Sequence, residues 1–202
     1  MIKVDYLQAR DYIANGNSGK IVLGLDRVRK LCEFLGNPQD KVKLIHISGT
    51  NGKGSVGTFI ASVLTASGYK VGRYTSPEVL NYRDKFSING QWISEDEFAS
   101  LTDVISRFVD KMPDRPTPFE IETALAYYYF EQNDCDFAVV ECGMGGKEDA
   151  TNVADNKVLS VLTSVALDHT QFLGDTLEKI TEQKIGIVKG SPLVSAGQCS
   201  EV

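Results

Sequence analysis

The sequence predicts an α/β fold in which a mostly parallel sheet is covered by helices on both faces. Three observations predict it: strands, loops and helices alternate along the chain, the strands are near-continuous apolar runs, and glycine-rich or polar loops follow them. No linker, internal repeat or low-complexity segment divides the 202 residues. We therefore expect one domain whose ligands bind at the carboxyl ends of the strands.

The first half of the chain is predicted as helix, strand, loop, helix and strand. Apolar residues at helical spacing over 25–35 predict a helix that Gly36-Asn37-Pro38 ends. A β-branched strand is expected over Lys43–Ser48, and a second over residues 69–74. Residues 75–90 are expected to form an irregular loop with a turn at Asn89-Gly90. The helix between the two strands has one predicted apolar face, formed by Val56, Phe59, Ile60, Val63 and Leu64.

The second half continues the alternation. Ser94 and Glu97 have the spacing of a capping box, which predicts a helix with the core face Phe98, Leu101, Ile105 and Phe108. Three prolines, Pro113, Pro116 and Pro118, interrupt that pattern. The remaining expected elements are a helix over 120–131, strands over 137–141 and 158–163, a helix over about 177–188 and a short strand over 193–195.

Composition excludes several classes of function. The chain has 27 acidic and 21 basic residues, a net charge of −6, and its basic residues are scattered, which argues against a broad nucleic-acid surface. No apolar run approaches the roughly 20 residues that cross a bilayer, and charges occupy the start of the chain where a signal peptide is apolar. Free buried thiols are expected at Cys32, Cys135 and Cys142, whereas Cys199 has a polar setting. A cytoplasmic protein, expected to be monomeric, fits these features.

The strongest chemical signal is Gly49-Thr50-Asn51-Gly52-Lys53-Gly54-Ser55, between a strand and a helix. Glycines let backbone N–H groups cradle a phosphate, the helix N-terminus favours negative charge, and Lys53 adds a point charge. The segment departs from the usual phosphate-loop pattern, because Ile47 replaces its first glycine and Gly54 separates the lysine from the hydroxyl residue. The alternative is a tight strand-to-helix turn without a ligand.

Two further polar groups follow strands at the same expected edge of the sheet. Glu141 ends the apolar run 137–140, and because a buried unpaired carboxylate costs several kcal/mol, either Mg²⁺ or a basic partner such as Lys53 is expected beside it. Asp168-His169 lies in a later strand-end loop. A histidine there is predicted to contact a metal or a phosphate, the alternative being a satisfied loop residue.

Four ordered motifs carry a family resemblance. They are 49–55, Tyr74-Thr75-Ser76-Pro77, Glu141-Cys142-Gly143-Met144-Gly145-Gly146 with Asp149-Ala150-Thr151-Asn152, and Leu167-Asp168-His169-Thr170 with Phe172-Leu173-Gly174. Together they resemble folylpolyglutamate synthase and dihydrofolate synthase, of the Mur ligase superfamily. The resemblance implies a phosphate-loop domain like the Mur ligase central domain. It implies ATP-dependent addition of L-glutamate to dihydropteroate, or to the γ-carboxylate of a folate glutamate tail, through an acyl phosphate.

The resemblance also assigns roles to residues. Catalytic roles are implied for Lys53, His169 and Lys184, and ATP binding for Gly49, Thr50, Asn51, Gly52, Lys53, Gly54 and Ser55. Magnesium ligands are implied at Ser76, Glu141, His169 and Lys184, the last as a carbamate, although an exposed Lys184 paired with Glu178 or Glu182 is the alternative. Substrate contacts are implied for Gly24, Leu25, Asp26, Thr117, Phe119, Glu148, Asp149 and Ala150, where Phe119 could equally be a core residue.

Departures from the family pattern concern both charge and length. Glu78 stands in place of a histidine, Lys147 in place of an arginine and Glu148 in place of an apolar residue. Family members continue into a C-terminal glutamate ligase domain, so residues 1–202 are interpreted as the N-terminal ATP-binding domain, the C-terminal domain being a partner that this chain lacks. Little or no turnover is then expected. The alternatives are a non-catalytic nucleotide- or folate-binding remnant and a Mur-type peptidoglycan ligase domain.

Overall fold

A seven-stranded sheet organises the chain in the computed structural model, which describes residues 5–15 and 23–195. Its strands lie in the order β4-β3-β2-β5-β1-β6-β7. The strands β2, β5, β1, β6 and β7 are parallel, and β3 and β4 add an antiparallel hairpin at one edge. Their bounds are β1 Lys43–Ser48, β2 Val71–Tyr74, β3 Phe86–Ile88, β4 Gln91–Trp92, β5 Phe137–Glu141, β6 Lys157–Leu162 and β7 Leu193–Ser195.

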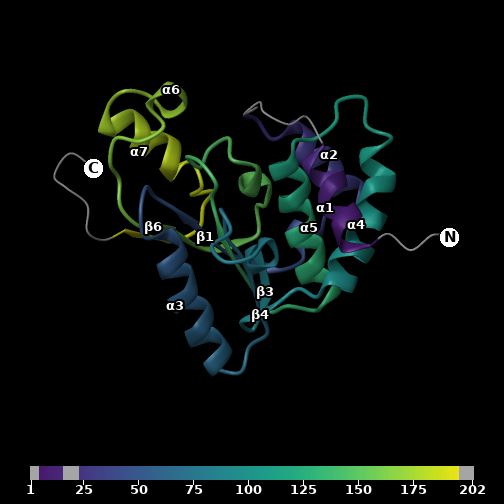
Figure 1. Cartoon of the computed structure of the whole chain (residues 1–202). Coiled ribbons are helices and arrows are strands. Elements are labelled where there is room, and N and C mark those ends of the chain that lie inside the picture. The colour runs from purple at the N-terminus through teal and green to yellow at the C-terminus, as the bar shows by residue number, and fades with distance from the viewer. Residues whose placement is uncertain (1–4, 16–22, 196–202) are drawn as a thin grey trace.

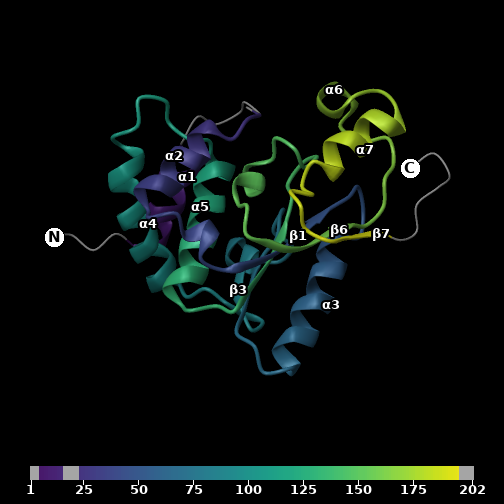
Figure 2. The same ribbon diagram turned by 180° about the vertical axis from the view of Figure 1, so that it is seen from behind.

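Helices cover the two faces of the sheet unequally. Figure 1 shows α3 alone on one side and α1, α2, α4 and α5 packed together on the other, and Figure 2 shows the same grouping from behind. The short helix α6 and α7 lie beyond the carboxyl ends of the strands. Helix bounds are α1 Tyr6–Ala14, α2 Asp26–Phe34, α3 Lys53–Ala66, α4 Glu95–Val109, α5 Pro118–Gln132, α6 Thr170–Leu173 and α7 Leu177–Ile185, with 3₁₀ turns at Pro38–Asp40, Tyr82–Lys85 and Ala150–Val153.

Alternate residues of the central strands face the two helical layers. On β1 and β5, Leu44 and Val140 belong to the larger core beneath α1, α2, α4 and α5, whereas Ile45, Ile47 and Val139 belong to the smaller core beneath α3. Because successive side chains of a strand point to opposite faces, both faces need an apolar cover. The central strands are therefore mostly apolar on both faces, and the predicted mostly parallel α/β fold is confirmed.

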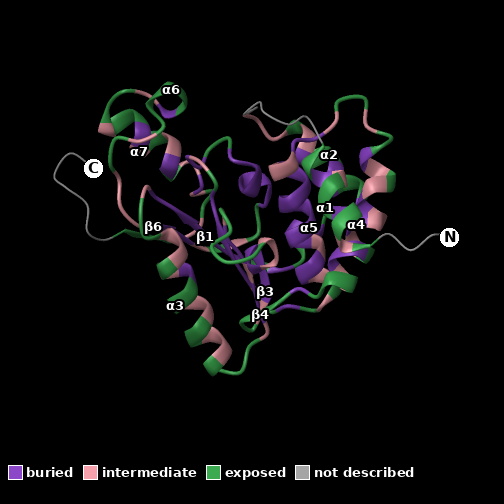
Figure 3. Ribbon diagram, viewed as in Figure 1, coloured by how far each residue is buried: buried purple, intermediate pink, exposed green. Residues whose placement is uncertain are grey.

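Two of the predictions about elements are wrong. Residues 75–90 are not an irregular loop, because they contain β3, and Asn89-Gly90 turns the chain from β3 into β4. The predicted single apolar face of α3 is wrong at Phe59 and Val63, which are 70% and 65% exposed. Figure 3 shows this outer side of α3 as exposed, in contrast to the buried helix α5. Helix α1 was not predicted at all.

Most other element boundaries agree with the predictions. Helix α5 begins at Pro118, two residues before the predicted start, because Thr117 caps it and proline is well suited to the first helical turn. Helix α4 begins after Ser94, whose side chain accepts a hydrogen bond from the Glu97 N–H as predicted. Helix α7 ends at Ile185, earlier than expected. Cys32, Cys135 and Cys142 are buried free thiols, and Cys199 lies outside the described residues.

The strand order gathers the polar loops at one edge of the sheet. Strands β2, β5, β1 and β6 are neighbours, and their carboxyl ends lead into Thr75, Cys142, Gly49 and Thr163. In the pairing of β1 with β5, Ile47 lies opposite Glu141. Segments from four separate parts of the chain therefore meet where ligands bind in open parallel sheets.

Candidate functional site

The glycine-rich segment after β1 forms a tight loop that leads directly into α3. Gly49 has a φ of 152°, and a Cβ there would lie 1.9 Å from the Thr163 side chain, so this position accepts only glycine. Gly52 adopts the left-handed conformation as the N-cap of α3. The Thr50 N–H donates to the Ser164 carbonyl at 2.6 Å, which ties the loop to the end of β6. The loop thus presents the N-terminus of α3 at the carboxyl edge of the sheet, a geometry that suits a phosphate.

Lys53 is the first residue of α3 and lies across this loop. Its Nζ donates to the carbonyl oxygens of Gly49 at 3.1 Å and Thr50 at 3.2 Å. The same Nζ lies 3.9 Å from Oε1 of Glu141, which is ion-pair distance. Lys53 is therefore the basic partner that the sequence analysis offered for Glu141, and its charge remains beside the loop.

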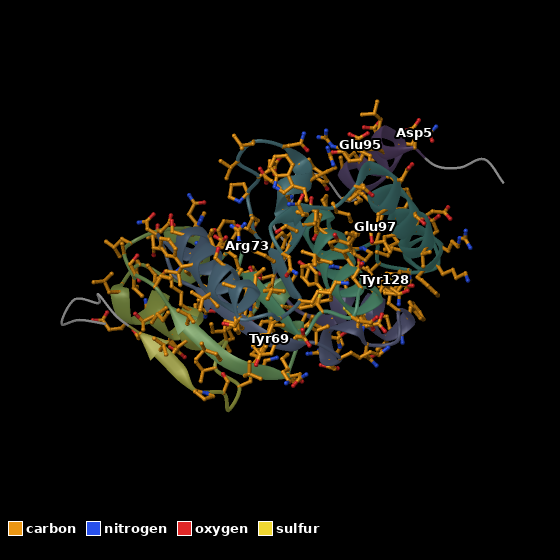
Figure 4. All side chains as sticks on the ribbon, turned by 90° about the horizontal axis from the view of Figure 1, so that it is seen from below. Asp5, Tyr69, Arg73, Glu95, Glu97 and Tyr128 are labelled. Atoms are coloured by element: carbon orange, nitrogen blue, oxygen red, sulfur yellow. The ribbon has the colours of Figure 1, made fainter. Side chains whose placement is uncertain are left out.

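Glu141 is a buried carboxylate at the end of β5. The Thr75 hydroxyl donates a short hydrogen bond to its Oε2. Burial raises the pKa of Glu141 above its ordinary value, while the Thr75 hydrogen bond and the Lys53 charge act in the opposite direction. A second cation approaches from β2: Arg73, labelled in Figure 4, lies against α3 with a guanidinium nitrogen 3.5 Å from the Gly54 carbonyl oxygen. Positive charge therefore surrounds this carboxylate on two sides.

Ser76 supplies an unusual oxygen next to this carboxylate. Its Oγ is buried, and it has no hydrogen-bond partner among the residues that the structure describes. Its neighbour Thr75 contacts Glu141 directly. A buried hydroxyl without a partner is costly, so an ion that binds it would relieve that cost. Hydroxyl and carboxylate oxygens with water are ligands that Mg²⁺ accepts.

In the part of the chain that the structure describes, no cluster rich in histidine, cysteine or carboxylates competes with Ser76 and Glu141 as a cation site. Within the described ranges, no group of three or more His, Cys, Asp and Glu side chains could hold a metal ion. His169 is half-exposed, has a φ of 48° as the N-cap of α6, and lines the same cavity as Ser76. Its Nε2 lies 3.6 Å from the Asp168 carboxylate. The residues present thus fit a hard cation better than zinc.

Lys184 is not the exposed helix lysine of the alternative interpretation. It is 2% exposed, and its Nζ donates to the Gly49 carbonyl at 2.9 Å. Burial and the nearby charge of Lys53 lower the pKa of Lys184 to about 8. A larger fraction of this amine is therefore unprotonated near neutral pH than for an exposed lysine, which is the form that reacts with carbon dioxide.

A cavity of about 470 Å³ opens near the glycine-rich loop. It lies between the segment before α2, the start of α5 and the loops that follow β2 and β5. Its wall is apolar at Pro77, Pro118, Phe119 and Met144 and carries charged groups at Glu78, Lys85 and Asp149. The volume and the mixed lining suit a small organic ligand with a flat ring. Of the predicted substrate-binding residues, those that line it are Gly24, Thr117, Phe119, Glu148, Asp149 and Ala150.

Two predicted substrate residues lie elsewhere. Leu25 packs against the main core, and Asp26 is exposed and faces Arg29 at 3.6 Å. Phe119 occupies both of its predicted settings, because it lines the cavity and also packs with Tyr74 at a ring distance of 6.2 Å. The Phe119 ring would clash with a Cβ at Gly143, so this glycine permits the close packing.

Sequence reasoning missed several residues of this site. Lys85 lines the cavity and is buried, with its Nζ 2.6 Å from Glu122 and 3.6 Å from Glu78. The 75–90 segment had been predicted as irregular, so nothing placed Lys85 against Glu122 of α5. The signal was Glu122 itself, because a carboxylate among the apolar residues of α5 needs a cation beside it when it is buried. Neither His46 nor Thr151, which lie behind Asp149, was assigned a role.

Comparison with protein families gives one match over most of the chain. Residues 47–196 match the family described as the Mur ligase middle domain. None of the described helices is both long and apolar enough to span a membrane.

Curated proteins with similar sequences carry names from folate metabolism. The chain is 40% identical over 197 residues to "Dihydrofolate synthase/folylpolyglutamate synthase" of Bacillus subtilis, covering 95% of this chain and 46% of that protein. It is 42% identical over 175 residues to the folylpolyglutamate synthase of Lacticaseibacillus casei, covering 84% of this chain and 41% of that protein. The chain thus spans about half the length of the curated relatives it matches.

Solved structures give the same picture. The apo form of the L. casei enzyme superposes with a TM-score of 0.93 at 37% identity, covering 98% of this chain and 49% of that one. E. coli FolC in complex with DHPP and ADP superposes with a TM-score of 0.83 at 36% identity, covering 91% of this chain and 44% of that one.

Proposed function

The chain belongs to the Mur ligase family, as the match of residues 47–196 to its middle domain shows, and from this premise we propose that it is the ATP-binding part of an ATP-dependent glutamate ligase. The proposed ligase adds L-glutamate to dihydropteroate, to the γ-carboxylate of a folate glutamate tail, or to both. In this proposal, residues 1–202 form the N-terminal domain, and the C-terminal domain found in the longer relatives is its partner. Relatives with both activities, and complexes of similar structures with nucleotide, support the proposal.

One observation carries the proposal: the glycine-rich loop at the start of α3 and the cavity of about 470 Å³ lie at the same edge of the sheet. Ser76 connects them, because it lines the cavity and directly follows Thr75, which contacts Glu141 beside the loop. A carboxylate substrate that enters the cavity would therefore approach the terminal phosphate of a nucleotide bound at Lys53. Such proximity is what transfer of a phosphoryl group to a carboxylate requires.

The reaction balances in two steps. A carboxylate oxygen of the substrate attacks the γ-phosphorus of ATP, the bond to the β,γ-bridging oxygen breaks, and ADP leaves. The amine nitrogen of glutamate then attacks the acyl carbon, inorganic phosphate leaves, and the nitrogen loses a proton to water. Lys53 and the N–H groups of the loop orient the phosphates and neutralise their charge, which is most of what phosphoryl transfer asks of a protein.

Ser76 and Glu141 are the residues that would hold Mg²⁺, with His169 and a carbamylated Lys184 completing the proposed set. When bound, the ion supplies charge neutralisation at the β- and γ-phosphates. The orphan hydroxyl of Ser76 supports this assignment independently of the motif. Lys184 supports it less directly, because it is buried with a lowered pKa.

Calorimetry with Mg-ATP tests the nucleotide site. Lys53→Ala and Glu141→Ala should each weaken binding by about 10- to 100-fold, because each removes a charged contact worth about 1.5–3 kcal/mol. Lys30→Ala is the matched control, since Lys30 pairs with Glu33 on the exposed side of α2. Unchanged affinity in both site variants would contradict the proposal.

A further inference from the structure

A chain of buried hydrogen bonds runs from β1 to the wall of the cavity. His46 on β1 is fully buried, and its Nε2 lies 2.8 Å from the Thr151 hydroxyl oxygen. The Thr151 hydroxyl in turn lies 2.5 Å from Oδ1 of Asp149, which lines the cavity. None of these contacts belongs to the nucleotide site. They join a histidine with no assigned role to the carboxylate proposed to contact the substrate.

The partners of Asp149 show which group donates and which accepts in this series of hydrogen bonds. Its Oδ1 accepts from the Thr151 N–H at 3.0 Å, and its Oδ2 accepts from the Met144 N–H at 2.8 Å. These two N–H groups can only donate, so each requires a lone pair on the carboxylate oxygen that it contacts. Several N–H donors favour the ionised form, although burial raises the pKa of Asp149. Asp149 is therefore the acceptor, and the Thr151 hydroxyl proton points to it.

The second hydrogen bond of the Thr151 hydroxyl oxygen, with His46, fixes which ring nitrogen of His46 carries the proton. Because the hydroxyl proton is used on Asp149, the oxygen must accept from His46, which requires a proton on Nε2. Burial and the charges of Lys157 and Lys189 hold the pKa of His46 well below its ordinary value, so the ring is neutral and Nδ1 carries no proton. Nδ1 has no partner among the described residues. Cys142 Sγ, 3.2 Å from Nε2, is a second, weaker neighbour of the same N–H.

We propose that His46 is a positioning residue for the substrate: through Thr151, its Nε2–H orients the Asp149 carboxylate toward a planar heterocycle that donates N–H groups. Oδ1 accepts two hydrogen bonds from Thr151, and Oδ2 accepts one from Met144. Asp149 is 4% exposed, so the lone pair left on Oδ2 can serve only a group inside the cavity. Because Thr151 holds Oδ1, this lone pair keeps one direction before the ligand arrives. The inference rests on the proposed function, in that the cavity receives the ring of a pteroate.

The tautomer of His46 tests the chain of hydrogen bonds without any ligand. The protein has only two histidines, so ¹⁵N-edited NMR can resolve both imidazole rings. The signal that is missing in His46→Phe belongs to the buried ring. We expect the Nε2–H form in the wild type. An Nδ1–H ring in the wild type overturns the inference.

Binding of 7,8-dihydropteroate tests the positioning role. His46→Phe keeps the ring volume and removes the donor, and it should weaken dihydropteroate binding by about 3- to 10-fold, which is the effect of one hydrogen bond. His46→Gln can donate from its amide and should bind within about 2-fold of the wild type, since the hydrogen bond is retained. The affinity for Mg-ATP should be equal in the wild type, His46→Phe and His46→Gln.

Tyr127→Phe is the matched control. It removes a buried hydrogen bond of 2.7 Å to the Thr151 carbonyl and leaves the hydroxyl chain intact, so dihydropteroate affinity should not change. Equal binding by wild type and His46→Phe overturns the positioning role. A wild type that binds Mg-ATP but not dihydropteroate overturns the proposed cavity function instead, while the tautomer still decides whether the chain of hydrogen bonds exists.

Discussion

A buried hydroxyl without a partner normally lowers stability, so Ser76 should be replaceable without loss of folding. Ser76→Ala removes an atom that makes no hydrogen bond with any described residue, and the free energy of unfolding should fall by no more than about 0.5 kcal/mol. If Ser76 holds Mg²⁺, the same variant should weaken Mg²⁺-dependent nucleotide binding by about tenfold.

Urea unfolding and nucleotide titrations at varied Mg²⁺ measure the two effects of Ser76→Ala separately. The matched variant is Thr75→Val, which removes a hydroxyl that does have a partner, Glu141, and should therefore cost stability. Reduced stability in Ser76→Ala together with an unchanged Mg²⁺ requirement would show a structural hydroxyl instead of a ligand.

Lys157 should make stability depend on pH in the alkaline range. Burial, followed by the charge of Lys189, lowers the pKa of Lys157 from 10.5 to about 8 in the folded protein. Between these two pH values the unfolded chain binds more protons than the folded chain, so this residue makes stability rise with pH. Below about pH 8 both states are protonated and the full cost of the buried charge remains.

Comparison of wild type with Lys157→Met by urea unfolding at several pH values checks this prediction. The difference in unfolding free energy, wild type minus variant, should increase by about 1–3 kcal/mol between pH 8 and 10.5 and stay flat below pH 8. The loss of the hydrogen bonds from Nζ to Asn152 and Ile187 shifts the whole curve without changing its slope. A difference that is flat across the range would contradict the lowered pKa.

Local sequence could predict which residues gather at the carboxyl edge, but not how their side chains pair. Lys53, Glu141 and His169 follow strands, so their common location was predictable from the fold class. The burial of Lys184 was not predictable, because the hydrophobic pattern of α7 does not reveal that the Lys184 side chain reaches the Gly49 carbonyl oxygen. The partners of His46 were unpredictable for the same reason, since Thr151 is far away in the sequence.

At the scale of elements, the Asn89-Gly90 turn fixes the hairpin to the central sheet. Asn89 and Gly90 both have positive φ, 48° and 77°, the combination typical of a tight two-residue hairpin. The Asn89 side chain also accepts a hydrogen bond from the Val71 N–H at 2.8 Å, at the first residue of β2. Asn89 therefore both forms the turn and accepts a hydrogen bond from the first residue of β2.

Substitutions of Asn89 should separate these two contributions. Asn89→Ala should lower the free energy of unfolding by about 2 kcal/mol, because it combines left-handed strain with an unpaired N–H. Asn89→Gly relieves the strain and should cost about 1 kcal/mol, while Asn89→Asp keeps an acceptor and should stay within about 0.5 kcal/mol of the wild type. Chemical denaturation ranks the three variants. Equal costs for alanine and glycine would mean that backbone strain contributes nothing here.

The elements that the sequence predicted best are short apolar runs bounded by turns, which are distinctive. Strands β1 and β5, which are mostly buried, have the predicted bounds, and so does the exposed edge strand β7. Strand β3 was missed because it has only three residues, and its signal was the Asn-Gly turn itself. Phe59 and Val63 were assigned to the core from spacing alone. Among the described helices, however, α3 stands alone on its face of the sheet, and one side of it stays exposed.

At the scale of the whole molecule, the glycine-rich loop is open to solvent at Asn51 and Gly52, which are exposed. Among the described residues, the cavity beside this loop is lined by the segment before α2, the start of α5 and the loops that follow β2 and β5. A nucleotide bound there would keep part of its phosphate chain in water. Electrostatic stabilisation of phosphoryl transfer is strongest where water is excluded.

We therefore predict that the 202-residue chain binds Mg-ATP but forms little or no glutamylated product. Incubation with ATP, Mg²⁺, L-glutamate and dihydropteroate, followed by mass spectrometry of the pteroate, measures this directly, and the Lys53→Ala variant gives the background. Addition of the remaining half of a relative such as the B. subtilis protein, which this chain covers over 46% of its length, should raise product above that background. The reason is that the added domain would close over the exposed side of the loop. Steady turnover by the 202-residue chain alone would mean that its own residues exclude water sufficiently. If the chain binds nucleotide but stays inactive with the added domain, the result would favour a non-catalytic binding protein.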